Sequence, residues 1–290
     1  MGDLMIENVI EVKDLSFSYT KVPFISDINF RVREGEIFGF LGPSGAGKST
    51  LQKILTGLCT SYSGSAKILG VESRQYTNAF YENIGVDFEF PSLYEKLTAR
   101  ENLRFFASLY KNPTRDISEL LDSVGLLAHG DKKVKDFSKG MKSRLNFIKA
   151  LIHDPKVLFL DEPTSGLDPN NAQIMKELIL AERDKGKTII ITTHNMQDAT
   201  ELCDRVVFIV DGQMKALDTP RNFIMSRGAT RVRYTYTENQ AECEGATLLT
   251  EVGSDPLLQR LIAENRITSI HSSEPTLNDV FIELTGARLC

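Results

Sequence analysis

The sequence is poor in cysteine and has no long apolar run. Its cysteines, Cys59, Cys203, Cys243 and Cys290, are scattered and form no CxxC pair. This scatter argues against a disulfide framework or a zinc site and favours a reducing compartment. No stretch is apolar for the length that a membrane-spanning helix needs. The start, MGDLMIENVIEV, lacks the basic flank and apolar run of a secretory signal peptide. If the protein serves a membrane, we therefore expect the membrane-spanning part to be another polypeptide or a part not contained in this sequence.

Positive charge is not in excess either. The chain has 34 lysine and arginine residues and 39 acidic residues, which gives a net charge of -5. The chain as a whole therefore has no electrostatic bias toward nucleic acid, although a local basic patch stays possible. With 290 residues, of which 41% are hydrophobic and 25% charged, it has the balance of a globular protein that buries a large core in one or two domains.

The apolar pattern predicts a strand, a glycine-rich loop and a helix in succession around GPSGAGKS. Strands are expected over residues 10–19 and 28–42, the latter divided by a turn at Glu34-Gly35, and a helix is expected over residues 48–58. From residue 91 to about 151 the apolar residues recur at three-four spacing, so this part is predicted to be mostly helical. Farther along we expect strands over 156–160 and 188–194, helices over 172–186 and 196–204, and a hairpin over 205–214 that turns at Asp211-Gly212.

After Pro220 the pattern changes. Residues 231–236 alternate as a half-buried strand should, residues 255–266 have the spacing of an amphipathic helix, and residues 267–270 are strand-like. Residues 276–286 are predicted to be a helix, with Thr276 and Asp279 placed as a capping box. We therefore expect a small α+β domain over 221–290, attached to a larger α/β domain over 1–220.

The stretch GPSGAGKS, from Gly42 to Ser49, matches the phosphate-loop pattern G-x-x-x-x-G-K-[ST]. Its glycines let backbone N–H groups point at phosphate oxygens, and the following helix adds the positive end of its dipole. Lys48 is expected to reach the β- and γ-phosphates of a nucleotide, and Ser49 to ligate Mg²⁺. A glycine-rich turn that only joins strand to helix is the alternative. The residues expected to contact the nucleotide here are Gly42, Pro43, Ser44, Gly45, Ala46, Gly47, Lys48, Ser49 and Thr50.

A second acidic motif, VLFLDEP, ends an apolar strand in Asp161 and Glu162. We expect Asp161 at the strand tip to reach the Mg²⁺ ion and Glu162 to orient and deprotonate an attacking water. Two acids at an ordinary strand end are the alternative interpretation, which the phosphate loop in the same chain makes the weaker one.

The order of GPSGAGKST, FSKGMKSR, VLFLDEPTSGLD and TTH resembles the nucleotide-binding subunit of ATP-binding-cassette (ABC) transporters over about residues 7 to 220. The tail, especially SSEPTLNDVFIELTG, resembles the ATPase subunits of bacterial exporters of drugs, antibiotics or polymers (the ABC-2 type). The resemblance implies an α/β fold, with a P-loop NTPase (RecA-like) core, an antiparallel β subdomain and a helical subdomain at about 91–151. It also implies an ATPase that uses ATP and Mg²⁺ at the cytoplasmic face of a membrane.

On this resemblance, FSKGM is the family's signature motif, with Lys139 and Met141 in place of its usual Gly and Gln. Ser138 and Gly140 stand where the family contacts phosphate, at the start of a predicted helix. One chain already has its own phosphate loop, so the resemblance implies a head-to-tail dimer in which this motif contacts the partner's ATP. A patch for nucleic acid and a merely solvated basic helix start are the alternatives for this stretch.

Further positions carry over from the family. Tyr19 is expected to stack on the adenine, with a core strand residue as its alternative. His194 is expected to touch the γ-phosphate, with a structural histidine at a strand end as its alternative. Asp168 is expected to lie in the loop that crosses to the partner, with a turn before the next helix as its alternative. Glu89 stands where most members carry a glutamine. A carboxylate there still suits Mg²⁺, so we expect hydrolysis to survive with altered metal dependence.

The resemblance also implies two partners, a second nucleotide-binding subunit, identical or not, and a separate transmembrane permease. The segment with Phe88, Phe90, Leu93 and Tyr94 is the candidate docking surface for a short helix of that permease, with ordinary core as its alternative. Nucleic acid is not an expected partner. The competing functions are a soluble ABC-type ATPase acting on nucleic acid or ribosomes, and a small-molecule kinase. The kinase leaves FSKGM and SGLD unexplained.

Overall fold

The computed structural model describes residues 8–90, 92–227, 231–238, 241–273 and 275–286. Within these residues the chain divides into two compact units, one up to Asp218 and one from Thr219 to Gly286. Residues 219 and 220, predicted to close the first domain, thus fall in the second unit. Pro91 and Cys290 lie outside the described residues.

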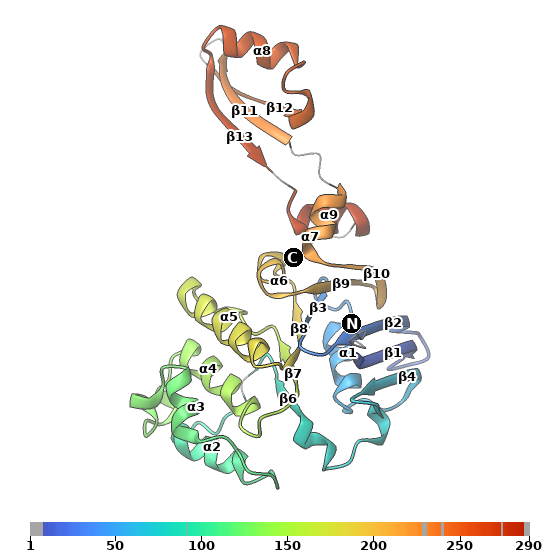
Figure 1. Cartoon of the computed structure of the whole chain (residues 1–290), viewed down its shortest axis with the longest axis vertical. Helices are drawn as coiled ribbons and strands as arrows, with labels where there is room; N and C mark the ends of the chain where they lie inside the picture. Colours follow the sequence, from blue (N-terminus) through green and yellow to red (C-terminus); the bar gives the residue numbers. More distant parts are fainter. Residues whose placement is uncertain (1–7, 91, 228–230, 239–240, 274, 287–290) are drawn as a thin grey trace, which may run out of the picture. The chain divides into compact units, whose positions relative to one another are not determined.

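The first unit contains an antiparallel sheet in the order β2-β1-β4-β5 and a second, mostly parallel sheet in the order β10-β9-β3-β8-β7-β6 (Figure 1). The strands of the antiparallel sheet are β1 (Asn8–Phe17), β2 (Ile25–Arg33), β4 (Tyr62–Ile68) and β5 (Val71–Glu72). Those of the other sheet are β3 (Ile37–Leu41), β6 (Ile84–Asp87), β7 (Val157–Asp161), β8 (Thr188–Thr193), β9 (Arg205–Val210) and β10 (Gln213–Asp218).

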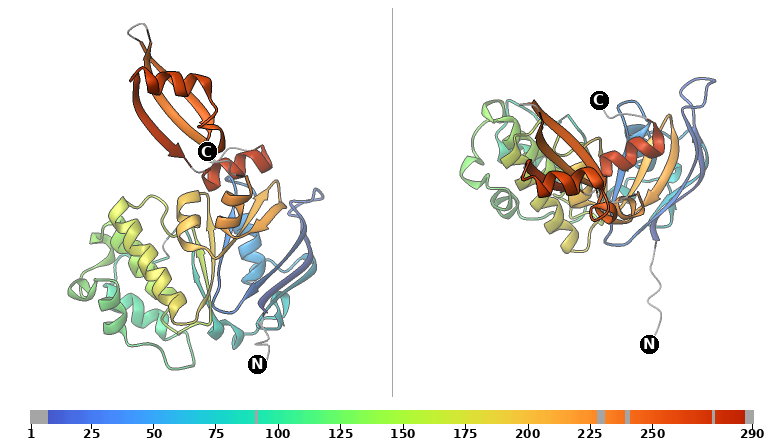
Figure 2. Two further views of the ribbon diagram at one scale, coloured as in Figure 1. Left: turned by 45° about the horizontal axis from the view of Figure 1, so that its top comes forward. Right: turned by 90° about the horizontal axis from the view of Figure 1, so that it is seen from above.

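Helices pack on both faces of the mostly parallel sheet, with α1 between the two sheets and α5 on the opposite side (Figures 1 and 2). The helices of this unit are α1 (Lys48–Leu55), α2 (Ala99–Ala107), α3 (Ile117–Ser123), α4 (Lys139–Ala150), α5 (Pro169–Asp184) and α6 (Met196–Leu202). Single 3₁₀ turns occur at Ser73–Gln75, Phe80–Asn83, Leu127–His129 and Val134–Asp136.

The core of the first unit fills the space between the sheets. β3 and β8 are buried along their whole length, as the apolar run IFGFL of β3 and the three central isoleucines of β8 predict. Their inward side chains join those of β1, β2 and α1 in one hydrophobic cluster, in which Phe38, Phe40 and Phe159 are fully buried. The turn between β9 and β10 is at Asp211-Gly212, with φ of 50° and 70°, as a type I′ hairpin requires.

Two details of the sequence-based prediction were wrong in this unit. The helix predicted over 48–58 ends at Leu55, and Leu58 is 61% exposed beyond it rather than on its apolar side. β4, β5 and β6 were not predicted, because β4 contains two serines and a glycine in place of β-branched residues, and β5 and β6 span only Val71–Glu72 and Ile84–Asp87. The predicted helical part contains three short helices, α2 to α4, joined by loops.

The second unit combines a three-stranded antiparallel sheet, in the order β12-β11-β13, with one helix packed on it and a separate helix pair. Tyr234 of β11 packs against Leu258 and Leu261 of α8, and α7 packs against α9. The capping box predicted at Thr276 and Asp279 is present. The elements are α7 (Pro220–Arg227), β11 (Arg231–Glu238), β12 (Ala241–Leu248), a 3₁₀ turn (Leu249–Glu251), α8 (Pro256–Ala263), β13 (Ile267–Ser273) and α9 (Leu277–Thr285).

Replacing Phe159 with alanine is expected to destabilise the first unit by about 3–5 kcal/mol, because the change leaves a cavity in a fully buried site. The free energy of unfolding from urea titration measures this effect. The control is Phe90→Ala, since Phe90 is 78% exposed, and it should stay within about 0.5 kcal/mol of the unaltered protein. Equal losses for the two variants would contradict the assigned core.

Candidate nucleotide-binding site

The loop between β3 and α1 has the backbone shape that a phosphate loop needs. Gly47 precedes the first residue of α1 with φ of 106°, a conformation that residues with a Cβ rarely adopt. The loop is closed by a hydrogen bond from Ala46 N to Pro43 O at 3.2 Å. Because the first N–H groups of a helix have no partner within the helix, the start of α1 is available to an anion.

Lys48 holds its ammonium group inside this loop. Its Nζ donates to Gly42 O at 2.7 Å and to Pro43 O at 3.1 Å. Burial lowers the pKa of Lys48, and the negative charges of Glu162, Asp161 and Glu89 oppose this effect. The loop therefore places one buried cation among three carboxylates.

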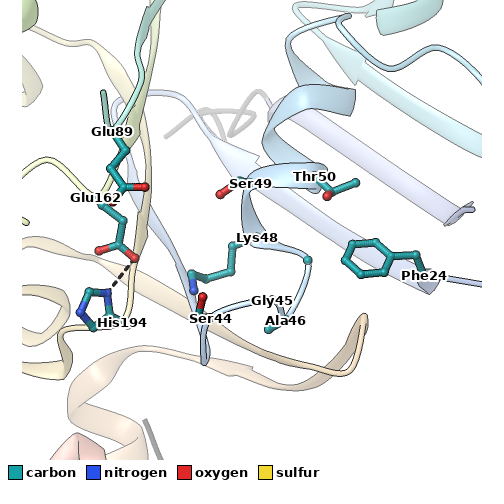
Figure 3. A pocket seen from close by; sticks show the side chains of 11 residues that line it. Phe24, Ser44, Gly45, Ala46, Lys48, Ser49, Thr50, Glu89, Glu162 and His194 are labelled. Atoms are coloured by element: carbon teal, nitrogen blue, oxygen red, sulfur yellow. Dashed lines mark hydrogen bonds and ion pairs between the residues drawn. The ribbon is translucent and has the colours of Figure 1, made fainter. Parts of the chain in front are cut away.

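A cavity of about 260 Å³ opens over the loop (Figure 3). In Figure 3, Glu89, Glu162 and His194 lie on one side of the cavity, Lys48 and Ser49 lie nearer its middle, and Phe24 lies at the other end. The residues that line it are Phe24, Ser44, Gly45, Ala46, Gly47, Lys48, Ser49, Thr50, Glu89, Glu162 and His194.

Asp161, at the end of β7, joins the phosphate loop to the sheet. Its Oδ1 accepts from Ser49 Oγ at 3.3 Å and also from Thr192 Oγ1 on the neighbouring strand. No cluster of three or more Asp, Glu, His or Cys side chains that could hold a metal ion occurs in the described part of the chain. The hydroxyl of Ser49 and the carboxylate of Asp161 are oxygen donors of the kind that Mg²⁺ takes together with substrate phosphates and water.

Glu162 and His194 form a contact at the rim of the cavity. His194 Nδ1 lies 2.9 Å from Glu162 Oε1, a distance that fits a hydrogen bond or ion pair. Glu162 has φ of 51°, the left-handed region that is uncommon for residues other than glycine. Its N–H donates to Thr192 O at 3.0 Å, which anchors this unusual backbone to β8. Such local strain is often found at functional sites.

Tyr19 lies in a bend after β1 and is 58% exposed, so the alternative of a core strand residue is wrong. Its hydroxyl is 3.0 Å from Thr50 Oγ1, next to the phosphate loop. The rings of Tyr19 and Phe24 are 5.4 Å apart between centroids. The sequence interpretation missed Phe24, although its place in the aromatic stretch SFSYTKVPF was a signal for it.

Ser138, Gly140 and Asp168 lie outside the lining of this cavity and near one another. Ser138 is the N-cap of α4, where its Oγ accepts from Met141 N at 3.2 Å. A Cβ on Gly140 would lie 2.6 Å from the side chain of Asn171, and that side chain donates to Asp168 at 2.6 Å. Asp168 is also the N-cap of α5, and the hydrogen bonds from Asn171 lower its pKa.

Comparison with known proteins identifies the family. A profile described as ABC transporter matches residues 25–165. The chain is 47% identical over 284 residues to the fluoroquinolones export ATP-binding protein of Mycobacterium tuberculosis, covering 97% of this chain and 94% of that protein. It is 35% identical over 298 residues to the Nod factor export ATP-binding protein I of Rhizobium meliloti, covering 97% and 89% respectively. The chain belongs to the ATP-binding subunits of ABC transporters.

A solved structure agrees with this assignment. The structure of cbiO1 from Clostridium perfringens, described as part of the ABC transporter complex cbiONQ, matches with a TM-score of 0.68 at 28% identity. The match covers 76% of this chain and 91% of cbiO1. The predicted P-loop NTPase fold and the predicted ATPase activity of an ABC subunit are thereby confirmed. In the described part of the chain, no helix of this ABC subunit combines the length and apolar character needed to cross a bilayer.

Replacing Tyr19 with alanine in this ABC subunit is expected to weaken ATP binding by about tenfold, within the range that loss of an aromatic stacking partner costs. GTP should be weakened similarly, because a ring face accepts any base. Titration with a fluorescent nucleotide analogue measures both affinities. The control Tyr19→Phe keeps the ring and removes only the hydroxyl near Thr50. Weakening in Tyr19→Phe equal to that in Tyr19→Ala would rule out the ring as the contact.

Proposed function

We propose that this ATPase subunit powers export across a membrane, by closing on ATP as a head-to-tail dimer and opening after hydrolysis. The observation that carries the proposal is the meeting of Lys48, Glu162 and His194 in one cavity over the phosphate loop. Export is supported by the relatives, which are named for the export of fluoroquinolones and Nod factors. The cavity would hold the nucleotide phosphates, with Tyr19 and Phe24 toward the base.

In this proposal the side chains divide the work of hydrolysis. Lys48 leaves its contacts with the loop carbonyls and pairs with the β- and γ-phosphates. Ser49 and Asp161 would hold Mg²⁺, with Glu89 as a further oxygen ligand, and the ion would offset phosphate charge. Glu162 orients the water and accepts its proton, while His194 fixes the Glu162 carboxylate and contacts the γ-phosphate.

The dimer is proposed because Ser138, Gly140 and Asp168 do not line the chain's own cavity. Ser138 and Gly140 open the twelve-residue helix α4, whose first N–H groups and positive dipole end suit an anion. With its own phosphate loop already at the cavity, a single chain has no use for a second phosphate contact. A two-fold dimer uses both, since each ATP then bridges the loop of one chain and α4 of the other. Asp168, beside this helix start, would contact the partner as well.

A transmembrane permease is the second proposed partner, on the cytoplasmic face of the membrane. Phe88, Phe90 and Tyr94 are all exposed, and Tyr94 stacks edge-on against the exposed Phe105 at 5.0 Å between centroids. Neighbouring exposed aromatic rings of this kind suit docking of an apolar helix. The relationship to cbiO1, which is part of a transporter complex, supports this partner.

Glu162→Gln is expected to bind ATP normally but to hydrolyse it at least about a hundredfold more slowly, because an amide cannot accept the proton from water. ATP should then hold the variant as a dimer that elutes early in size-exclusion chromatography. The matched control is Glu177→Gln, an exposed residue of α5. Normal hydrolysis by Glu162→Gln would refute the role of this carboxylate.

Glu89→Gln tests the unusual residue beside the cavity. Hydrolysis should persist, and the Mg²⁺ concentration that gives half-maximal rate should rise several-fold, because an amide oxygen binds a hard cation less strongly than a carboxylate does. Phosphate release measured across a Mg²⁺ titration, and again with Mn²⁺, gives the comparison. Glu119→Gln, on the exposed side of α3, is the control. Unchanged rate and unchanged metal requirement would show that Glu89 does not contact the ion.

A further inference from the structure

A buried carboxylate outside the nucleotide cavity joins β6 to α4. Asp87, the last residue of β6, is 7% exposed, and its Oδ1 accepts a hydrogen bond from the side-chain amide of Asn146. The same amide of Asn146, which is 2% exposed, reaches Phe88 O at 3.4 Å. Burial raises the pKa of Asp87 to about 7, and the charge of Lys149 opposes this rise.

Lys149 extends the network to a third element. Its Nζ donates to Asn146 Oδ1 at 2.6 Å and lies 5.1 Å from the centroid of the Phe106 ring on α2. The network therefore connects the end of β6 to α4 and α4 to α2. Buried polar groups cost desolvation energy, and apolar side chains of similar volume often replace such pairs without loss of stability. A contribution to stability therefore explains this network poorly. The fixed geometry that it sets between β6, α4 and α2 explains it better.

The two elements that the network joins both lead to the proposed phosphate contacts. Asp87 is two residues before Glu89, which lines the nucleotide cavity. Asn146 lies on α4, about 12 Å along the helix from its N-cap Ser138 at 1.5 Å per residue. A second cavity of about 350 Å³ lies between the end of β6 and α4. Its lining includes Asp87, Glu89 and Asn146. The polar contact at Asp87 thus lies between the nucleotide site and the helix that begins at Ser138.

We propose that the Asp87–Asn146 hydrogen bond is a positioning contact. It keeps α4, which begins after Ser138, at a fixed position relative to Glu89. It would couple occupancy of a chain's own cavity to the contact that α4 makes with the nucleotide of the partner. This inference rests on the proposed dimer. Asp87 and Asn146 touch no substrate in this role, so their loss should affect closure of the dimer and not the binding of ATP to a single chain.

The test is the double variant Asp87→Leu/Asn146→Leu in the full-length chain, with and without Glu162→Gln. Replacing both partners by apolar groups leaves no polar atom on either side chain, and Lys149, which loses its acceptor on Asn146, is only half-buried and can turn its ammonium group to water, so the fold should persist. We expect ATP affinity to stay within about twofold, kcat to fall about tenfold, and the ATP concentration needed for the Glu162→Gln dimer to rise about tenfold. The variant Asp87→Asn, in place of the double variant, keeps an oxygen that accepts from Asn146. In the Glu162→Gln background it should therefore form the dimer at the ATP concentration that Glu162→Gln alone needs.

Two single variants keep the inference testable if the double variant does not fold. Lys149→Met removes the donor to Asn146, and should lower kcat by about threefold without changing ATP affinity. Lys142→Met is the matched control on the same helix, because Lys142 pairs with Glu95 and not with the network.

The outcomes separate this inference from the proposed function. Wild-type kcat and dimer formation in a folded double variant, or equal kcat in Lys149→Met and Lys142→Met, would overturn the positioning role. Absence of an ATP-dependent dimer in Glu162→Gln alone would instead refute the proposed dimer itself.

Discussion

The balance of charge around Lys48 is the constraint on which the nucleotide site depends. One buried ammonium group faces Glu162, Asp161 and Glu89, so the cavity carries excess negative charge before any phosphate enters. A nucleotide adds more of the same sign. Backbone N–H groups and the dipole of α1 offset part of that charge, and in the proposed mechanism a divalent cation would offset more of it. This explains why the glycine loop, the helix start and the hard-oxygen ligands must meet at one edge of the sheet.

The parallel strands supply that meeting point. β3, β7 and β8 are neighbours in the sheet, so their carboxyl ends lie side by side. The phosphate loop follows β3, Asp161 ends β7, and His194 follows β8. Ligand sites at the carboxyl ends of parallel strands are general in open α/β sheets. Hydrogen bonds between strand ends, such as that from Thr192 to Asp161, then fix the acidic side chains relative to the loop.

Much of this arrangement could be predicted from the sequence, because the phosphate loop and the VLFLDEP strand carry their own local signals. The parts that were missed depend on packing. β4 has two serines and a glycine where a strand usually has β-branched residues, and it is held in the sheet by pairing with β1 and β5. Phe24 comes into the site through the fold of β1 and β2. The Asp87–Asn146 contact joins residues 59 positions apart, so no local sequence pattern could predict it.

The start of α4 is already engaged within its own chain, which bears on how a dimer would close. Gly140 abuts Asn171, and a Cβ on Gly166 would lie 2.0 Å from Lys139 Nζ, so this ammonium group rests against the loop before Asp168. A phosphate arriving from a partner would draw Lys139 and the N–H groups of α4 toward itself. The loop holding Asp168 would lose that contact at the same moment. Closure would therefore release one set of contacts to form another, which is the condition for a two-state switch driven by differential affinity.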